Sequence, residues 1–209
     1  MSWYHWVLVF SASFFLIWLV FNLFRLVQRG LPEDFSIPAG NVKKGIRYSF
    51  TGALNPVKKE SAYLHLPTYI AGICYHTGTF LSFGLIPVMI LRIILPPYLL
   101  IIIGSGILIS IGCGTGILIK RIVTGKLRHL SSPDDYLSNL LVTLFQIVTL
   151  VVIIKGSLFP SYFIFLSLLL LYIPVGKLKH LLYFFAARTQ LGNFYGRRGV
   201  WPPVNNYKK

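Results

Sequence analysis

Three histidines lie in or beside apolar stretches that are long enough to cross a lipid bilayer: His65, His76 and His180. An ionisable side chain inside a membrane is costly, and it is usually retained for a function. Two neutral imidazoles on packed helices can ligate one haem iron from both sides. The same side chains can also serve as hydrogen-bonding groups between helices. The chemistry open to these histidines therefore depends on which stretches span the membrane and in which direction.

The composition is that of an integral membrane protein. Of the 209 residues, 55% are hydrophobic and only 12% are charged, and the mean hydropathy is +0.70. A soluble domain carries about 25% charged residues. Apolar runs of about 18 or more residues predict membrane spans, and we identify five, at residues 6–24, 67–91, 97–119, 137–154 and 161–187. Because open sheet edges are not tolerated in lipid, we predict an all-α integral membrane protein with a bundle of five transmembrane helices.

The distribution of basic residues predicts the orientation of these spans. The formal net charge is +15, and only Arg92 and Lys155 of the twenty Lys and Arg residues lie in the second and fourth connections. The other eighteen lie in the first and third connections, at the end of span five and in the tail. This positive-inside pattern predicts an external N-terminus, a cytoplasmic C-terminus and a multi-pass protein of the cytoplasmic (inner) membrane. It also indicates that the basic residues reflect the orientation of the protein in the membrane and not nucleic-acid binding.

Two further patterns concern the connections and the third span. Residues 28–66 form a long cytoplasmic loop, and a loop of this length is usually functional or bound to a partner. Before span four, Ser132 and Asp135 have the spacing of a helix cap, so Asp134 and Asp135 are predicted to be structural.

In span three, Gly112 and Gly116 have GxxxG spacing. This spacing predicts either close helix packing or a smooth face against a flat cofactor.

Depth selects one pair of histidines. If span two begins near Pro67, His76 lies roughly 13 Å from its cytoplasmic end, and if span five ends near Ala187, His180 lies roughly 10 Å from that end. Because the two spans run in opposite directions, the two imidazoles come to similar depth. They are the best pair for ligating one b-type haem. His65 precedes Pro67 at the cytoplasmic edge and is the alternative ligand.

At these histidines the sequence resembles a known family. The Tyr75–Gly78 segment (YHTG) and residues 173–184 (IPVGKLKHLLYF) resemble the respiratory nitrate reductase gamma subunit. Residues 55–80 and 130–145 look closer to the membrane cytochrome of heterodisulfide-reductase-like complexes. The resemblance implies a five-span cytochrome b that transfers electrons between membrane quinone and an iron–sulfur partner subunit on the cytoplasmic side.

The sequence departs from the family pattern at two positions. The family has a second histidine on span two and another on span five, where this chain has Ile86 and Tyr162. The loss of both outer ligands favours one haem b over two, ligated by His76 and His180. Basic residues at the cytoplasmic ends are candidates for pairing with the haem propionates, namely Arg121, Arg128, Lys177 and Lys179.

We therefore predict that residues 1–209 form a single membrane cytochrome b domain. Its role is that of an electron-transfer subunit of a respiratory oxidoreductase complex, not of a complete enzyme. The 28–66 loop and the basic tail would dock the iron–sulfur subunit. The alternative is a haem-free structural membrane anchor of a multisubunit complex, in which the histidines only pack between helices.

Overall fold

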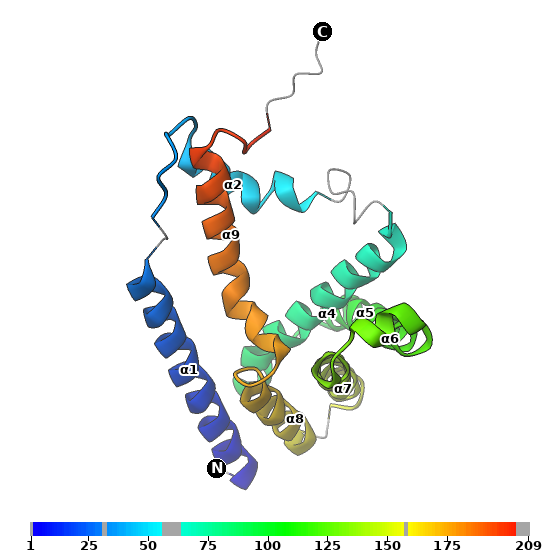
Figure 1. Ribbon diagram of the computed structural model, residues 1–209. Helices are drawn as coiled ribbons and strands as arrows, with labels where there is room; N and C mark the ends of the chain where they lie inside the picture. The colour runs from blue at the N-terminus through cyan, green and yellow to red at the C-terminus, as the bar shows by residue number, and fades with distance from the viewer. Residues whose placement is uncertain (1, 31–32, 56–63, 157–158, 204–209) are drawn as a thin grey trace. The chain divides into compact units, whose positions relative to one another are not determined.

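The computed structural model describes residues 2–30, 33–55, 64–156 and 159–203, whose regular structure is helical throughout (Figure 1). Four helices are long and apolar enough to cross a membrane: α1 (Trp3–Arg29), α4 (Leu66–Ile90), α5 (Pro97–Val123) and α7 (Pro133–Lys155). A fifth span is possible if α8 (Phe159–Tyr172) and α9 (His180–Arg197) are taken together. The prediction of an all-helical, multi-pass membrane protein is thus confirmed. The shorter elements are α2 (Val42–Ser49), η1 (Gly52–Leu54), α6 (Gly125–Leu130) and η3 (Lys177–Lys179).

The predicted fifth span, residues 161–187, differs from the single helix expected from its hydropathy. Helix α8 ends at Tyr172, and α9 begins only at His180. Pro174 cannot donate a backbone hydrogen bond and disfavours helical conformation in the residue before it. The Gly176 N–H donates to the Tyr172 carbonyl at 2.9 Å, and the Tyr172 ring occupies the space that a Cβ on Gly176 would need. The chain therefore turns at this point.

The chain divides into two compact units. The bundle unit comprises residues 1–17 and 67–178, and the α2–α9 unit comprises residues 18–66 and 179–209. In the bundle unit, α7 packs against α5 and α8. The Phe145 and Tyr162 rings are both fully buried, with centroids 5.6 Å apart, and Ile107 of α5 is fully buried as well. The core of this unit therefore lies along α7.

In the α2–α9 unit, glycines bring two helix backbones into contact (Figure 1). A Cβ on Gly45 of α2 would collide with the backbone of Gly192 and Gly196 of α9. The N–H groups of Ala39 and Gly40 both donate to the Arg197 carbonyl, at 2.8 and 3.0 Å. Helix α2 begins at the cap residue Asn41, whose side-chain oxygen accepts the Lys44 N–H at 3.0 Å. These contacts hold α2 along the second half of α9.

Candidate functional site

His76 lies on α4, ten residues after Leu66, or about 15 Å along the helix. Its side chain is exposed, and its ring centroid is 6.4 Å from that of Phe80, one turn later. One turn earlier, a Cβ on Gly72 would meet no atom within 4 Å. Gly72 therefore leaves room one turn before His76, and Phe80 lies one turn after it.

His180 is the first residue of α9 and is also exposed. Phe184 follows one turn later with 40% of its surface exposed, and the Arg188 guanidinium lies 5.6 Å from the centroid of its ring. The two histidines thus share one local arrangement, in which an exposed imidazole is followed four residues later by an exposed phenylalanine. Sequence reasoning did not use this shared spacing, although it is visible in the sequence.

His65, the alternative ligand, lies in a turn just before α4 and is exposed. His65 and His180 belong to the α2–α9 unit, whereas His76 belongs to the bundle unit. The surroundings of each histidine are therefore described within its own unit. Pairing of His76 with His180 at one iron stays a prediction.

The residue before His76 points into the bundle interior. The Tyr75 hydroxyl donates to the Asn139 carbonyl at 2.9 Å and lies 3.0 Å from the Thr143 hydroxyl, so it joins α4 to α7. The absence of a side chain on Gly114 of α5 makes room for the tyrosine ring, because a Cβ there would collide with it. The Asn139 amide in turn donates to the Gly114 carbonyl at 3.2 Å. Tyr75 thereby fixes the rotation of α4 about its own axis.

A second polar layer lies one turn further along α7. Ser110 and Gln146 are both fully buried, and the serine hydroxyl lies 2.9 Å from the amide oxygen of Gln146. The Gln146 amide nitrogen donates to the Thr79 hydroxyl at 2.8 Å. Three helices are therefore joined by neutral hydrogen bonds. These residues were missed from the sequence, although Asn139, Thr143 and Gln146 recur at the spacing of one helix face within an apolar run.

The predicted cap of α7 is confirmed. Ser132 and Asp135 form a capping box, in which each side chain bonds the other residue's backbone. The Asp135 carboxylate also pairs with Arg121 at 2.8 Å and with Lys177 at 2.6 Å. One carboxylate thus ties together the end of α5, the start of α7 and η3. The role predicted for Asp135 was structural, and these contacts agree with it.

These ion pairs bear on the four propionate candidates. Arg121 and Lys177 are engaged with Asp135. Arg128, on α6, and Lys179, in η3, are exposed. The last two are therefore the ones whose charge is more accessible to an anionic group.

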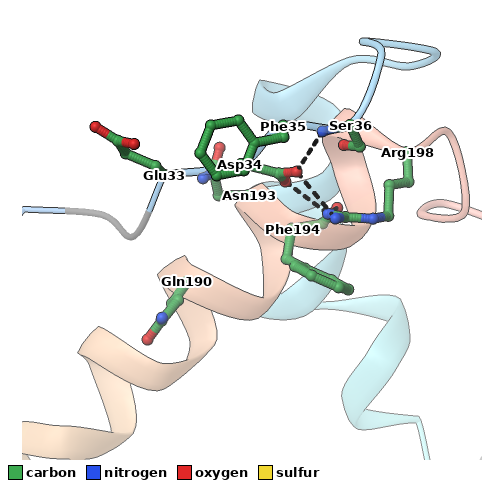
Figure 2. A pocket seen from close by; sticks show the side chains of 8 residues that line it. All are labelled: Glu33, Asp34, Phe35, Ser36, Gln190, Asn193, Phe194 and Arg198. Atoms are coloured by element: carbon green, nitrogen blue, oxygen red, sulfur yellow. Dashed lines mark hydrogen bonds and ion pairs between the residues drawn. The ribbon is translucent and has the colours of Figure 1, made fainter.

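The α2–α9 unit contains an ion pair between Arg198 and Asp34 (Figure 2). Arg198 contacts both carboxylate oxygens of Asp34, at 2.6 and 2.9 Å, and its guanidinium lies 3.6 Å from the centroid of the Phe194 ring. The hydroxyl and the backbone N–H of Ser36, together with Arg198, lower the pKa of Asp34 to about 2. A cavity of about 400 Å³ adjoins this pair. Since both charges are paired, we infer that this ion pair is structural and holds residues 33–36 against α9.

Comparisons with protein-family models, curated proteins and solved structures find no match for this chain. The resemblance to nitrate reductase gamma-like cytochromes therefore stays a prediction. In the part of the chain that the structure describes, no group of three or more His, Cys, Asp or Glu side chains could hold a metal ion.

Proposed function

We propose that this chain is the haem b membrane subunit of a redox complex, with His76 and His180 as the axial ligands. The observation that carries the proposal is the arrangement shared by the two residues. Each imidazole is exposed at an apolar helix, and each has an exposed phenylalanine one turn later. An ionisable side chain within a membrane span is costly and is usually retained for a function.

The surroundings of His76 fit a flat, apolar macrocycle. Gly72 presents no side chain, and the open space beside it lies one helical turn from the imidazole. Phe80 offers an aromatic face on the other side. A bound haem would supply one-electron transfer, and the protein would set its orientation and surroundings. Phe184 lies at the equivalent position beside His180.

The residues of the bundle unit would act by positioning. Tyr75 is held inward by its contacts with Asn139 and Thr143. Successive residues of a helix are about 100° apart, so a Tyr75 fixed inward directs His76 toward a side of α4 outside the bundle core. On the other segment, the turn at Pro174 and Gly176 sets where α9 begins, and His180 is the first residue of that helix.

The wider role follows the resemblance and the charge pattern. The chain would exchange electrons between membrane quinone and an iron–sulfur subunit on the cytoplasmic side. Arg128 and Lys179 are the better candidates for haem propionates because both are exposed. The basic loop 28–66 and the C-terminal tail would dock the partner, although residues 31–32, 56–63 and 204–209 lie outside the described part of the chain. The positive-inside pattern supports an external N-terminus in the inner membrane.

An absorption spectrum of the purified protein tests this function. We expect a b-type α-band after reduction with dithionite in the wild type, and loss of haem in His76→Ala and in His180→Ala. His129→Ala is the matched control, because His129 is exposed on the short helix α6, and it should retain haem. His65→Ala should retain it too. A well-folded wild type without an α-band would contradict the proposal and favour the haem-free anchor.

A further inference from the structure

A second cavity in the α2–α9 unit has an aromatic lining and a single charge. Its volume is about 560 Å³, within the range of about 300–1,000 Å³ that is usual for ligand pockets. The principal lining side chains are Tyr48, Phe184, Arg188, Leu191, Tyr195 and Trp201. Arg188 is the one charged residue among those that line it. The pocket therefore combines a large apolar surface with one cationic group.

The walls of this pocket come from both α2 and α9. The Trp201 ring lies 4.7 Å from Tyr195 and 5.6 Å from Tyr48 between centroids, so the tryptophan connects α9 to α2. Along α9, Phe184, Arg188 and Leu191 recur four and three residues apart and share one helix face. The glycine contacts between α2 and α9 hold these two walls together.

The charge of the unit selects an anionic ligand. The unit contains thirteen Lys and Arg residues and three acidic residues, so it carries +10 of the chain's formal net charge of +15. On α2, Lys43, Lys44 and Arg47 are exposed, and they precede the pocket residue Tyr48 by one to five positions in the sequence. Asp34 is paired with Arg198 at 2.6 Å, and the pocket lining contains no carboxylate. Clusters of four to eight basic residues next to membrane helices are typical of sites for anionic lipids.

The aromatic lining favours a lipid over a soluble anion. Tyrosine and tryptophan concentrate where the membrane meets water, because their rings are apolar and their tips are polar. An inorganic anion would use Arg188 and leave the aromatic surface unfilled. A phospholipid would use both, with its phosphate at the guanidinium and the start of its acyl chains against the rings.

We propose that this pocket binds one anionic phospholipid, with the headgroup phosphate at Arg188 and the upper acyl chains against Tyr48, Tyr195 and Trp201. The pocket contains neither histidine ligand, although it shares Phe184 with the proposed surroundings of His180. Its occupant is a membrane component and not a segment of a protein partner.

Fluorescence quenching of Trp201 by brominated lipids tests the site in the full-length protein. Trp3, Trp6 and Trp18 are replaced by phenylalanine, so that Trp201 is the remaining tryptophan. We expect brominated phosphatidylglycerol to quench Trp201 at about tenfold lower lipid concentration than brominated phosphatidylcholine. Equal quenching by the two lipids would overturn the proposal, and this comparison needs no pocket variant.

Variants then assign the effect to Arg188. Arg188→Gln should raise the required phosphatidylglycerol concentration about tenfold. Arg188→Lys should keep most of the preference, because the positive charge remains. Lys44→Gln, which removes a neighbouring surface charge of the same unit, is the control and should change it by less than about fivefold. Equal effects of Arg188→Gln and Lys44→Gln would refute a specific site. Loss of quenching on adding inorganic phosphate or an acidic peptide at matched ionic strength would reassign the pocket to a soluble anion or a protein partner.

Discussion

Replacing Gly114 with alanine should destabilise the bundle unit far more than replacing Gly112, two residues earlier on the same helix. An added Cβ on Gly114 would collide with the Tyr75 ring and come within 3.0 Å of the Thr143 hydroxyl. An added Cβ on Gly112 would meet nothing within 4 Å. The pair therefore separates the effect of a methyl group on a helix from its effect at a close helix contact.

The expected loss of unfolding free energy follows from the steric overlap and from the hydrogen bonds that Tyr75 would lose. Forcing a methyl group into a packed interior costs about 1–3 kcal/mol. If the Tyr75 ring moves, it also loses its hydrogen bonds to Asn139 and Thr143, and interhelical hydrogen bonds in membranes contribute about 0.6 kcal/mol each on average. We expect Gly114→Ala to lower the free energy of unfolding by about 2–4 kcal/mol. Gly112→Ala should leave it unchanged or raise it by up to about 1 kcal/mol, because alanine favours the helix over glycine.

Reversible unfolding in mixed detergent micelles, followed by circular dichroism, measures both values. A double variant sharpens the test, because Tyr75→Ala removes the ring that Gly114→Ala would strike. The two changes should then cost less together than the sum of their separate costs. Equal losses for Gly114→Ala and Gly112→Ala, or full additivity with Tyr75→Ala, would show that the helix contact at Gly114 does not control the stability of the bundle.

Three further predictions concern stabilising contacts away from the histidines. Asp135→Ala should lower the free energy of unfolding by about 1–3 kcal/mol, because it removes a helix cap and two partly exposed ion pairs, and chemical denaturation measures this loss. Gly45→Ala should reduce hydrogen-exchange protection along α2, because its Cβ would strike the backbone of α9, whereas Gly125→Ala, in open space, should not. The depressed pKa of Asp34 means that its contribution to stability is present above pH about 4 and is lost as the pH falls toward about 2. Arg198→Gln should reduce this acid sensitivity in thermal unfolding scans, and an unchanged pH profile would contradict the role of the pair.

The spans were predictable because each depends on its own composition. An apolar run of about 20 residues satisfies its backbone as a helix in lipid whatever its neighbours are. The predicted runs 67–91 and 97–119 accordingly begin within one residue of helices Leu66–Ile90 and Pro97–Val123. The cap at Ser132 and Asp135 was predictable for the same reason, since all its groups lie within four residues.

The break within residues 161–187 was missed although its causes are local. Hydropathy alone made these residues one span, whereas the break depends on Pro174 and on the packing of Gly176 against Tyr172. Features that depend on partners distant in the sequence were not predictable from such local patterns. The glycine spacing in span three drew attention to Gly112 and Gly116, yet neither would bring an added Cβ within 4 Å of another atom. The close approach is at Gly114, because the rotation of α5 is set by Tyr75 on α4, far away in the sequence.

The interior of the bundle unit explains why the histidines call for a different role from the other polar residues. Tyr75, Ser110, Thr143 and Gln146 already join α4, α5 and α7 through neutral hydrogen bonds. His76 is exposed and takes no part in the hydrogen bonds of these four residues. In a haem-free anchor whose histidines pack between helices, His76→Leu would remove a hydrogen-bonding group and lower stability. In a cytochrome the same substitution would abolish haem binding while the apoprotein stayed folded. A His76→Leu variant that unfolds would contradict the cytochrome and support the anchor, because it would place the imidazole among the groups that hold the helices together.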